Sequence, residues 1–256
     1  MTGVARSRTE NDAAGALAFR ESLSLAREAQ ALDVAAAASM NLGVIELRSG
    51  ALMASRASLV EARRLYTTLQ NVGSRLVAIY NLANVEREAG SMEEASTLYT
   101  DAIALATGLG ADDILIGAHA GLGLTALRLD QQEAAAEALE NALDALGDRA
   151  DWWFQGRELL ESLAVRLTAS RGEPQAAHVR FSVAVERLLA LEDYAVAWFV
   201  ADCAGALVEQ FPSIRAEIDQ HSETAVCRGF KVISARFTAL RDLMDRAPSV
   251  MRAASA

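Results

Sequence analysis

Two asparagines, Asn41 and Asn81, stand forty positions apart in stretches that match in further places, NLGVIELRSG at 41–50 and NLANVEREAG at 81–90. An asparagine side chain carries a carbonyl acceptor and two amide donors, so it can pair with both the N–H and the C=O of another backbone. The pair predicts a site that clamps an extended peptide without reading its side chains. The same register continues with Gly121, Ser162 and Asp202, so only two asparagines occupy it.

Charged side chains follow each asparagine at a fixed distance. Arg48 and Glu88 come seven residues later, about two helical turns, and Arg128 holds the same register in the next period. Arg48 and Arg128 could meet carboxylates of a partner, and Glu88 a basic side chain. Further polar and aromatic contacts with a partner are expected beside the second asparagine, from Tyr80, Asn84 and Arg87. The alternative is that the asparagines cap neighbouring backbone and the charges link adjacent repeats, because surface ion pairs need no ligand.

These positions recur because most of the sequence is periodic, with a step near 40 residues. A large or soft apolar residue precedes a small one at Leu42–Gly43, Leu82–Ala83, Leu122–Gly123, Leu163–Ala164 and Cys203–Ala204. A helix-breaking residue follows each pair at a similar distance, at Gly50, Gly90, Asp130, Gly172 and Pro212. Each period is therefore predicted to hold a first helix, a tight turn and a second helix.

The second helices align as well. GALAFRESLSLA at 15–26 matches ASTLYTDAIALA at 95–106, which pairs Phe19 with Tyr99, Leu23 with Ile103 and Leu25 with Leu105. The recurring small residues mark the seam where two antiparallel helices cross, since a larger side chain would hold the backbones apart.

The pattern resembles the tetratricopeptide repeat, with Leu-Gly within the first helix, Gly at the turn, and Ala, an aromatic or Leu, and Ala along the second. The resemblance covers roughly residues 13 to 247. It departs in the period, near 40 rather than 34, and lacks the family's early Trp, the Tyr of the first helix and the Pro at the repeat end. The longer period is similar to the repeat regions of large bacterial signal-transducing regulators of the MalT and LuxR-associated type, as is RGEPQAAHVRFSVAVERLLALEDY at 171–194. The chain has neither their phosphate-binding motif nor their helix-turn-helix domain.

The resemblance implies an all-α fold, a right-handed α-solenoid of antiparallel helix hairpins. In such a stack the first helices line the concave surface, and repeated Asn looks like the asparagine ladder of peptide-binding grooves. About five repeats are expected, at roughly 33–72, 73–111, 112–150, 152–191 and 193–247, preceded by a lone helix from residue 13. Residues 1–12 and 248–256 are expected to be disordered.

Both ends of the repeat array carry exposed apolar candidates. The lone N-terminal helix aligns with a second helix, so its partner face is expected to be open. At the other end an apolar stripe at helical spacing predicts one long helix that caps the last repeat, or alternatively an association surface. The stripe consists of Val226, Phe230, Ile233, Phe237, Leu240 and Met244.

Composition narrows the function classes. The 256 residues are 52% apolar with three prolines and a formal charge of −10, which favours a helical core and disfavours nucleic-acid binding. The N-terminus lacks the apolar stretch of a signal peptide, and no apolar run is long enough for a membrane span, so a cytoplasmic protein is expected. From Val226 onward six basic residues outnumber two acids, which is either a solvated helix face or a surface for an anionic partner.

Catalytic and metal-binding patterns are lacking. GLGLTA at 121–126 fits a dinucleotide fingerprint, but it is predicted to lie within a helix rather than between a strand and a helix. His119, His178 and His221 are far apart and follow no metal-binding spacing, and Cys203 and Cys227 form no ligand set. The adjacent Trp152, Trp153 and Phe154 are read as a core cluster with one exposed member. The sequence therefore predicts no cofactor, no metal and no enzymatic activity.

The predicted function is a non-enzymatic scaffold or adaptor that holds a protein or peptide segment in its groove. Two alternatives remain open: a structural subunit that docks or homo-oligomerises through its terminal helices, and a small-molecule sensor module like the repeat region of the MalT-type regulators.

Overall fold

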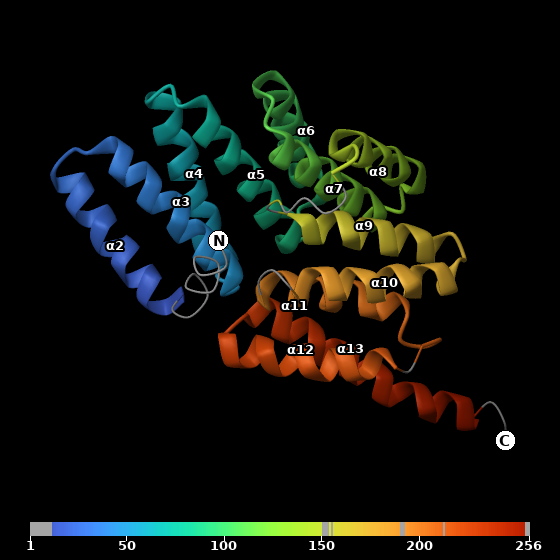
Figure 1. Cartoon of the computed structure of the whole chain (residues 1–256). Coiled ribbons are helices and arrows are strands. Elements are labelled where there is room, and N and C mark those ends of the chain that lie inside the picture. The colour runs from blue at the N-terminus through green and yellow to red at the C-terminus, as the bar shows by residue number, and fades with distance from the viewer. Residues whose placement is uncertain (1–11, 150–153, 155, 190–192, 212, 254–256) are drawn as a thin grey trace. The chain divides into compact units, whose positions relative to one another are not determined.

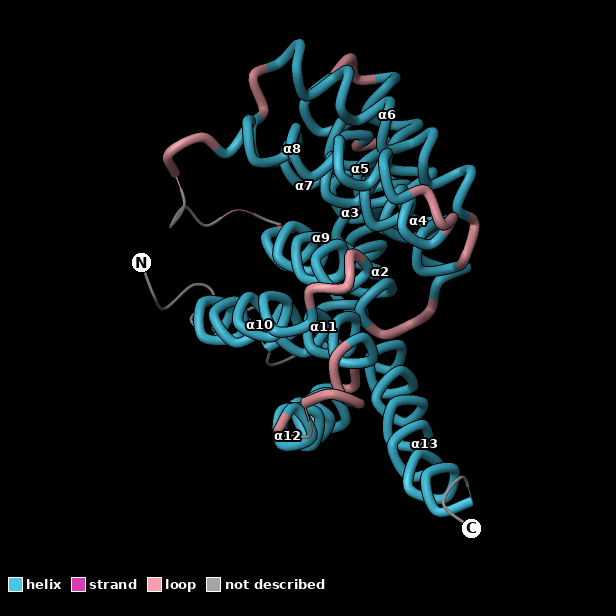
Figure 2. The backbone as a smooth tube through the Cα atoms, turned by 90° about the vertical axis from the view of Figure 1, so that its right-hand side faces the viewer, coloured by secondary structure: helices cyan, strands magenta, loops and turns pink. Residues whose placement is uncertain are grey.

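The computed structural model describes residues 12–149, 154, 156–189, 193–211 and 213–253. These residues form helices joined by short turns and contain no strand, as Figure 2 shows. They divide into two compact units with the boundary between Leu160 and Glu161. The predicted all-α repeat fold is confirmed. The expected disordered residues 1–11 and the pair Trp152–Trp153 lie outside the described residues.

The unit before the boundary is a stack of antiparallel helices in which each helix packs against the next (Figure 1). Its helices are α2 (Asp12–Glu28), α3 (Leu32–Arg48), α4 (Leu52–Thr68), α5 (Val72–Ala89), α6 (Met92–Leu109), α7 (Asp112–Arg128) and α8 (Gln132–Leu146). The first helices α3, α5 and α7 begin at Leu32, Val72 and Asp112. Within this unit the observed helix pairs follow the helix–turn–helix pattern of the first three periods.

Most of these helices end at a residue in the left-handed backbone region. Gly90 has φ 88°, and the N–H of the next residue, Ser91, bonds to the carbonyl of Glu86 at 2.9 Å, which closes the last turn of α5. The turns after α2, α4 and α7 use Gln30, Gln70 and Asp130 in the same region, at φ values of 53° to 57°. Residues other than glycine adopt this conformation at some cost in free energy, yet three of them do so here. A search of the sequence for Gly and Pro alone therefore misses some of the turns.

Small residues form the seam between helices, as predicted. A Cβ atom on Gly43 would lie 2.6 Å from Cγ of Leu59, and one on Gly121 would lie 2.3 Å from Cζ of Tyr99. The hydroxyl of Ser55 adds a bond to the carbonyl of Gly43 at 2.6 Å, joining α4 to α3. A larger residue at either glycine would push the helix pair apart.

The last part of the chain departs from the helix-pair pattern. Helix α9 (Arg157–Ser170) crosses the unit boundary, and it is followed by α10 (Pro174–Leu189), α11 (Asp193–Cys203), the short η1 (Ala204–Ala206), α12 (Ile214–Arg228) and α13 (Lys231–Ala253). Helix α11 thus ends at the residue pair that lies mid-helix in earlier periods. The region of the fifth predicted repeat, 193–247, holds α11, α12 and most of α13, and α13 extends through residues 248–253, which were expected to be disordered.

The predicted single C-terminal helix is also wrong at its start. Gly229, at φ 74°, ends α12, and its N–H bonds to the carbonyls of Ala225 and Val226. Val226 therefore belongs to α12 and is 66% exposed, whereas Phe230, Ile233 and Phe237 are buried. Leu240 and Met244 are partly exposed on α13. Phe230, Ile233 and Phe237 agree with the interpretation of the stripe as a cap on the last repeat, because their side chains are buried.

Candidate binding surface

The first helices α3, α5 and α7 lie side by side, since α5 contacts both of the others (Figure 1). Residues four, seven and eleven positions apart share one side of a helix. We call the row that contains five of the eight predicted groove residues the first-helix face. It comprises Ala37, Asn41, Val44 and Arg48 on α3 and Val77, Asn81, Asn84 and Glu88 on α5. Ala37 and Asn41 are exposed, so the α3 end of the face is the accessible end.

Asn41 is the one exposed residue among the eight predicted for the groove. Its amide Nδ2 donates to the carbonyl of Ala37 at 2.8 Å, one turn earlier in α3. The side-chain amide of Asn41 therefore donates within its own helix. A hydrogen bond of this kind to neighbouring backbone is what the alternative to a peptide clamp proposed.

Tyr80 and Asn81 do not line an open groove, and their assignment to one is corrected here. Tyr80 is 1% exposed. Its hydroxyl oxygen would lie 2.6 Å from a Cβ atom added to Gly117 and 2.3 Å from one added to Gly156. Asn81 is 4% exposed and donates to Sδ of Met40 in α3 at 3.7 Å. Both side chains point into the stack, where they join neighbouring helices.

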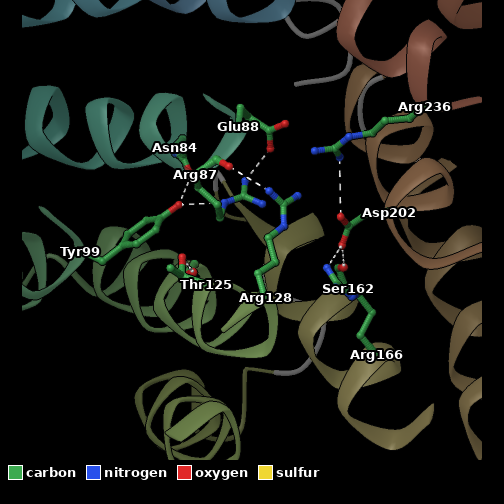
Figure 3. A network of polar contacts seen from close by, with 11 residues as sticks. Asn84, Arg87, Glu88, Tyr99, Thr125, Arg128, Ser162, Arg166, Asp202 and Arg236 are labelled. Atoms are coloured by element: carbon green, nitrogen blue, oxygen red, sulfur yellow. Dashed lines mark hydrogen bonds and ion pairs between the residues drawn. The ribbon is translucent and has the colours of Figure 1, made fainter. Parts of the chain in front are cut away.

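Arg87 is the centre of a buried polar cluster at the end of α5, shown in Figure 3. It is 2% exposed, so it cannot reach a partner across an open groove. Its Nε donates to the hydroxyl of Tyr99 at 3.1 Å, and that hydroxyl donates to Oδ1 of Asn84 at 2.6 Å. Nη2 of Arg87 forms an ion pair with Oε1 of Glu88 at 3.1 Å. Burial raises the pKa of Tyr99, which keeps the hydroxyl protonated and able to donate.

The two remaining arginines of the prediction also connect helices. Nε of Arg48 lies 3.4 Å from Oδ2 of Asp12 in α2, and burial raises the pKa of Asp12 although the arginine opposes the shift. Nη1 of Arg128 in α7 donates to the carbonyl of Arg87 in α5 at 2.8 Å (Figure 3). Together with Asn81 these contacts link α2 to α3, α3 to α5, and α5 to α7. Arg48, Asn81 and Arg128 therefore connect neighbouring helices of the stack.

Two buried glutamates that the sequence analysis did not select have a similar bracing role. Glu46 accepts from Nη2 of Arg20 in α2 at 3.2 Å and from the hydroxyl of Ser58 in α4 at 2.8 Å. Glu86, one period later, accepts from Arg56 in α4 through both carboxylate oxygens. Both glutamates lie in the two matching stretches of the sequence, 41–50 and 81–90. The recurrence of glutamate at the same place in both stretches is a sequence signal for this brace, as clear as the recurrence of asparagine.

The unit after the boundary has its own buried polar cluster, also drawn in Figure 3. Ser162 of α9 and Asp202 of α11 continue the asparagine register, and the Ser162 hydroxyl donates to Oδ2 of Asp202. Arg166 pairs with the same oxygen at 3.1 Å, and Nη1 of Arg236 lies 3.6 Å from Oδ1. The thiol of Cys203 donates to Ser162 at 3.4 Å, and burial raises the pKa of this thiol. This cluster likewise joins helices, and its thiol is not a reactive thiolate.

The described residues hold no group of three or more His, Cys, Asp or Glu that could bind a metal ion. GLGLTA lies within α7, where Gly121 faces Tyr99, so its position in a helix is as predicted. Over the same described part of the chain, no helix combines the length and apolar character that a bilayer crossing requires.

No protein-family model matches the sequence, and no curated protein matches it. Solved structures do resemble the chain. The crystal structure of BtubC (BKLC) from P. vanneervenii has a TM-score of 0.54 and 16% identity, over 90% of this chain and 91% of that one. A Rap protein complexed with Competence and Sporulation Factor has a TM-score of 0.56 and 11% identity, over 95% of this chain and 78% of that one. At these identities the similarity concerns the fold, which is of the tetratricopeptide-like helical-repeat kind.

Proposed function

We propose that the chain is a non-enzymatic interaction module that holds a segment of a protein or peptide partner on its first-helix face. The observation that carries this proposal is the side-by-side arrangement of α3 and α5, which leaves Ala37 and Asn41 exposed beside the partly exposed Val44, Val77 and Asn84. A face of this kind offers apolar contact together with amide hydrogen bonds.

The rigidity of the face supports the same proposal. Asn84 of this face accepts a hydrogen bond from Tyr99, which accepts one from the buried Arg87, and Arg128 ties α7 to α5. A preformed surface loses little conformational entropy when a partner binds. A fold of the same kind occurs in the Rap protein complexed with Competence and Sporulation Factor, so it can accommodate a bound partner.

The partner remains defined by chemistry alone: a protein or peptide segment, in a cytoplasmic setting, with no cofactor involved. The likeness to MalT-type regulators, and the repeat period near 40 residues on which it rests, stay part of this proposal.

The test is affinity capture from the native cell lysate with mass spectrometry of the eluted proteins. Ala37→Arg and Asn41→Ala change the exposed part of the face and leave the braces intact, while Ala57→Arg places the same arginine on the exposed side of α4. We expect a protein that wild type and Ala57→Arg capture and that the combined Ala37→Arg, Asn41→Ala variant loses. Equal capture by all three would refute binding at this face. Asn81→Ala is not suitable, because Asn81 is buried.

A further inference from the structure

The charged side chains expected to meet a partner at the first-helix face already have contacts inside the stack. Nε of Arg48 lies 3.4 Å from Oδ2 of Asp12, and the Arg48 side chain is 13% exposed. Oε1 of Glu88 lies 3.1 Å from Nη2 of Arg87, and the Glu88 side chain is 4% exposed. Nη1 of Arg128, on α7, donates to the carbonyl of Arg87 at 2.8 Å (Figure 3). These three side chains are therefore engaged within the protein.

A charged side chain of a partner would have to compete with these internal contacts. Withdrawing Glu88 from Arg87 would remove a carboxylate from a guanidinium group whose side chain is 2% exposed, and breaking a buried pair is strongly unfavourable. A new ion pair at the protein surface contributes little in return, because water and salt screen it. The face therefore disfavours charged contacts although charged residues belong to it.

The most accessible positions of the face are uncharged. Ala37 and Asn41 are its exposed members, and Val44 and Val77 are partly exposed. Asn41 donates through Nδ2 to the carbonyl of Ala37, which leaves Oδ1 as an acceptor. An ionised group that gave up its water against these side chains would gain no opposite charge from them, whereas an apolar or amide group would be accommodated.

We propose that the segment held on the first-helix face contributes uncharged side chains and its own backbone to the contact. This inference rests on the proposed function and specifies the chemistry of the partner. It differs from what the formal charge of −10 suggests, since an acidic protein attracts basic partners. Binding at this face should consequently depend little on salt, whereas a basic partner would bind more weakly as salt is added.

One exposed carboxylate stands close to the face and gives a control for charge. Asp33 lies in the first turn of α3, one turn before Ala37 and outside the row that forms the face. A carboxylate at this place stabilises the helix through its dipole, so it needs no partner. Asp33→Asn removes the charge and keeps the shape of the side chain.

The test selects peptides from a random library displayed on phage, with the full chain as bait. Peptides are kept if they bind wild type and the Ala57→Arg control but not the Ala37→Arg, Asn41→Ala variant, and are then synthesised with acetylated and amidated ends to remove terminal charges. We expect sequences poor in Asp, Glu, Lys and Arg. Their Kd, from fluorescence anisotropy, should change by less than about threefold between about 50 mM and about 500 mM NaCl. Asp33→Asn should leave Kd within about twofold of wild type.

Two results would overturn the inference and leave the proposed function standing. One is enrichment of acidic or basic residues among the selected peptides, with a Kd that weakens at least about tenfold over the same salt range. The other is a loss of at least about tenfold in affinity for Asp33→Asn, which would assign a basic contact to that carboxylate. If no peptide distinguishes wild type from the double variant, the proposed function fails and this inference fails with it. Thermal unfolding of each variant checks that the fold is retained.

Discussion

The polar side chains predicted to bind a partner include one that is exposed and several that are buried. Asn41 and Asn81 hold the same register, but the first is exposed and the second is 4% exposed. The same amide can clamp a partner or bind a neighbouring helix, and the sequence does not distinguish these roles. What decides is whether a neighbouring helix covers the position, as α3 does for Asn81 through Met40.

The two asparagines should therefore differ in their effect on stability. Asn81→Ala removes a buried amide and its contact with Met40, and we expect a loss of about 1 to 3 kcal/mol in the free energy of unfolding. Asn41→Ala should change it by less than about 0.5 kcal/mol, as is usual for exposed sites. Urea denaturation of both variants measures the difference, and equal losses would contradict the assigned burial.

The buried glutamate brace predicts an asymmetry between its partners. The side chain of Glu86 is 2% exposed and that of Arg56 is 43% exposed. Arg56→Ala leaves a buried carboxylate without its guanidinium and should cost about 2 to 4 kcal/mol. Glu86→Gln leaves an arginine that can turn into water, and should cost about 1 kcal/mol. If denaturation showed the glutamine variant to be the less stable one, Glu86 would not depend on Arg56.

His119 on α7 links stability to pH. Burial lowers its pKa below the ordinary value, so the folded chain disfavours the imidazolium. Below about pH 6.5 the unfolded chain binds a proton that the folded chain binds less readily, and stability falls as the pH falls. His119→Gln should lose less stability than wild type between about pH 7 and 5. Denaturation curves at both pH values test this, and parallel losses would show that the histidine titrates normally.

Helix pairs were predictable because their signals are local. Leucine before a small residue, and a turn residue at a fixed distance, recur in the first three periods, and the structure places helices α3 to α8 accordingly. The same signals were insufficient after residue 200. The Cys203–Ala204 pair ends α11 rather than continuing it, and Gly229 interrupts the apolar stripe. A periodic stripe reports which side of a helix is apolar, but it does not report where a single glycine ends one helix and starts another.

Alanine substitutions at two glycines distinguish the close packing of helices at the seam from the low helix propensity of glycine. Gly121→Ala would place a Cβ 2.3 Å from the ring of Tyr99, so we expect a destabilisation of about 1 to 3 kcal/mol. Gly108 lies in α6 with open space around it, and Gly108→Ala should stabilise the fold by up to about 1 kcal/mol. Thermal denaturation gives both shifts. A stabilising Gly121→Ala would mean that the helices are not in close contact at the seam.

The chain as a whole is an acidic helical-repeat protein with a formal charge of −10. Its polar clusters hold helices together within each unit, and the first-helix face is exposed at Ala37 and Asn41 of α3. Because the braces are internal, binding at the exposed positions of this face leaves them intact. We therefore expect recognition to depend on a few exposed positions and stability on the buried polar network.

Hydrogen–deuterium exchange on the complex with the captured partner measures which helices the partner covers. We expect partner-dependent protection of amides in α3 and α5, with little change in α4, α6 and α8, because the first-helix face is the proposed contact. The Ala37→Arg, Asn41→Ala variant at the same partner concentration should show no such protection. Protection confined to α4, α6 and α8 would contradict the central claim.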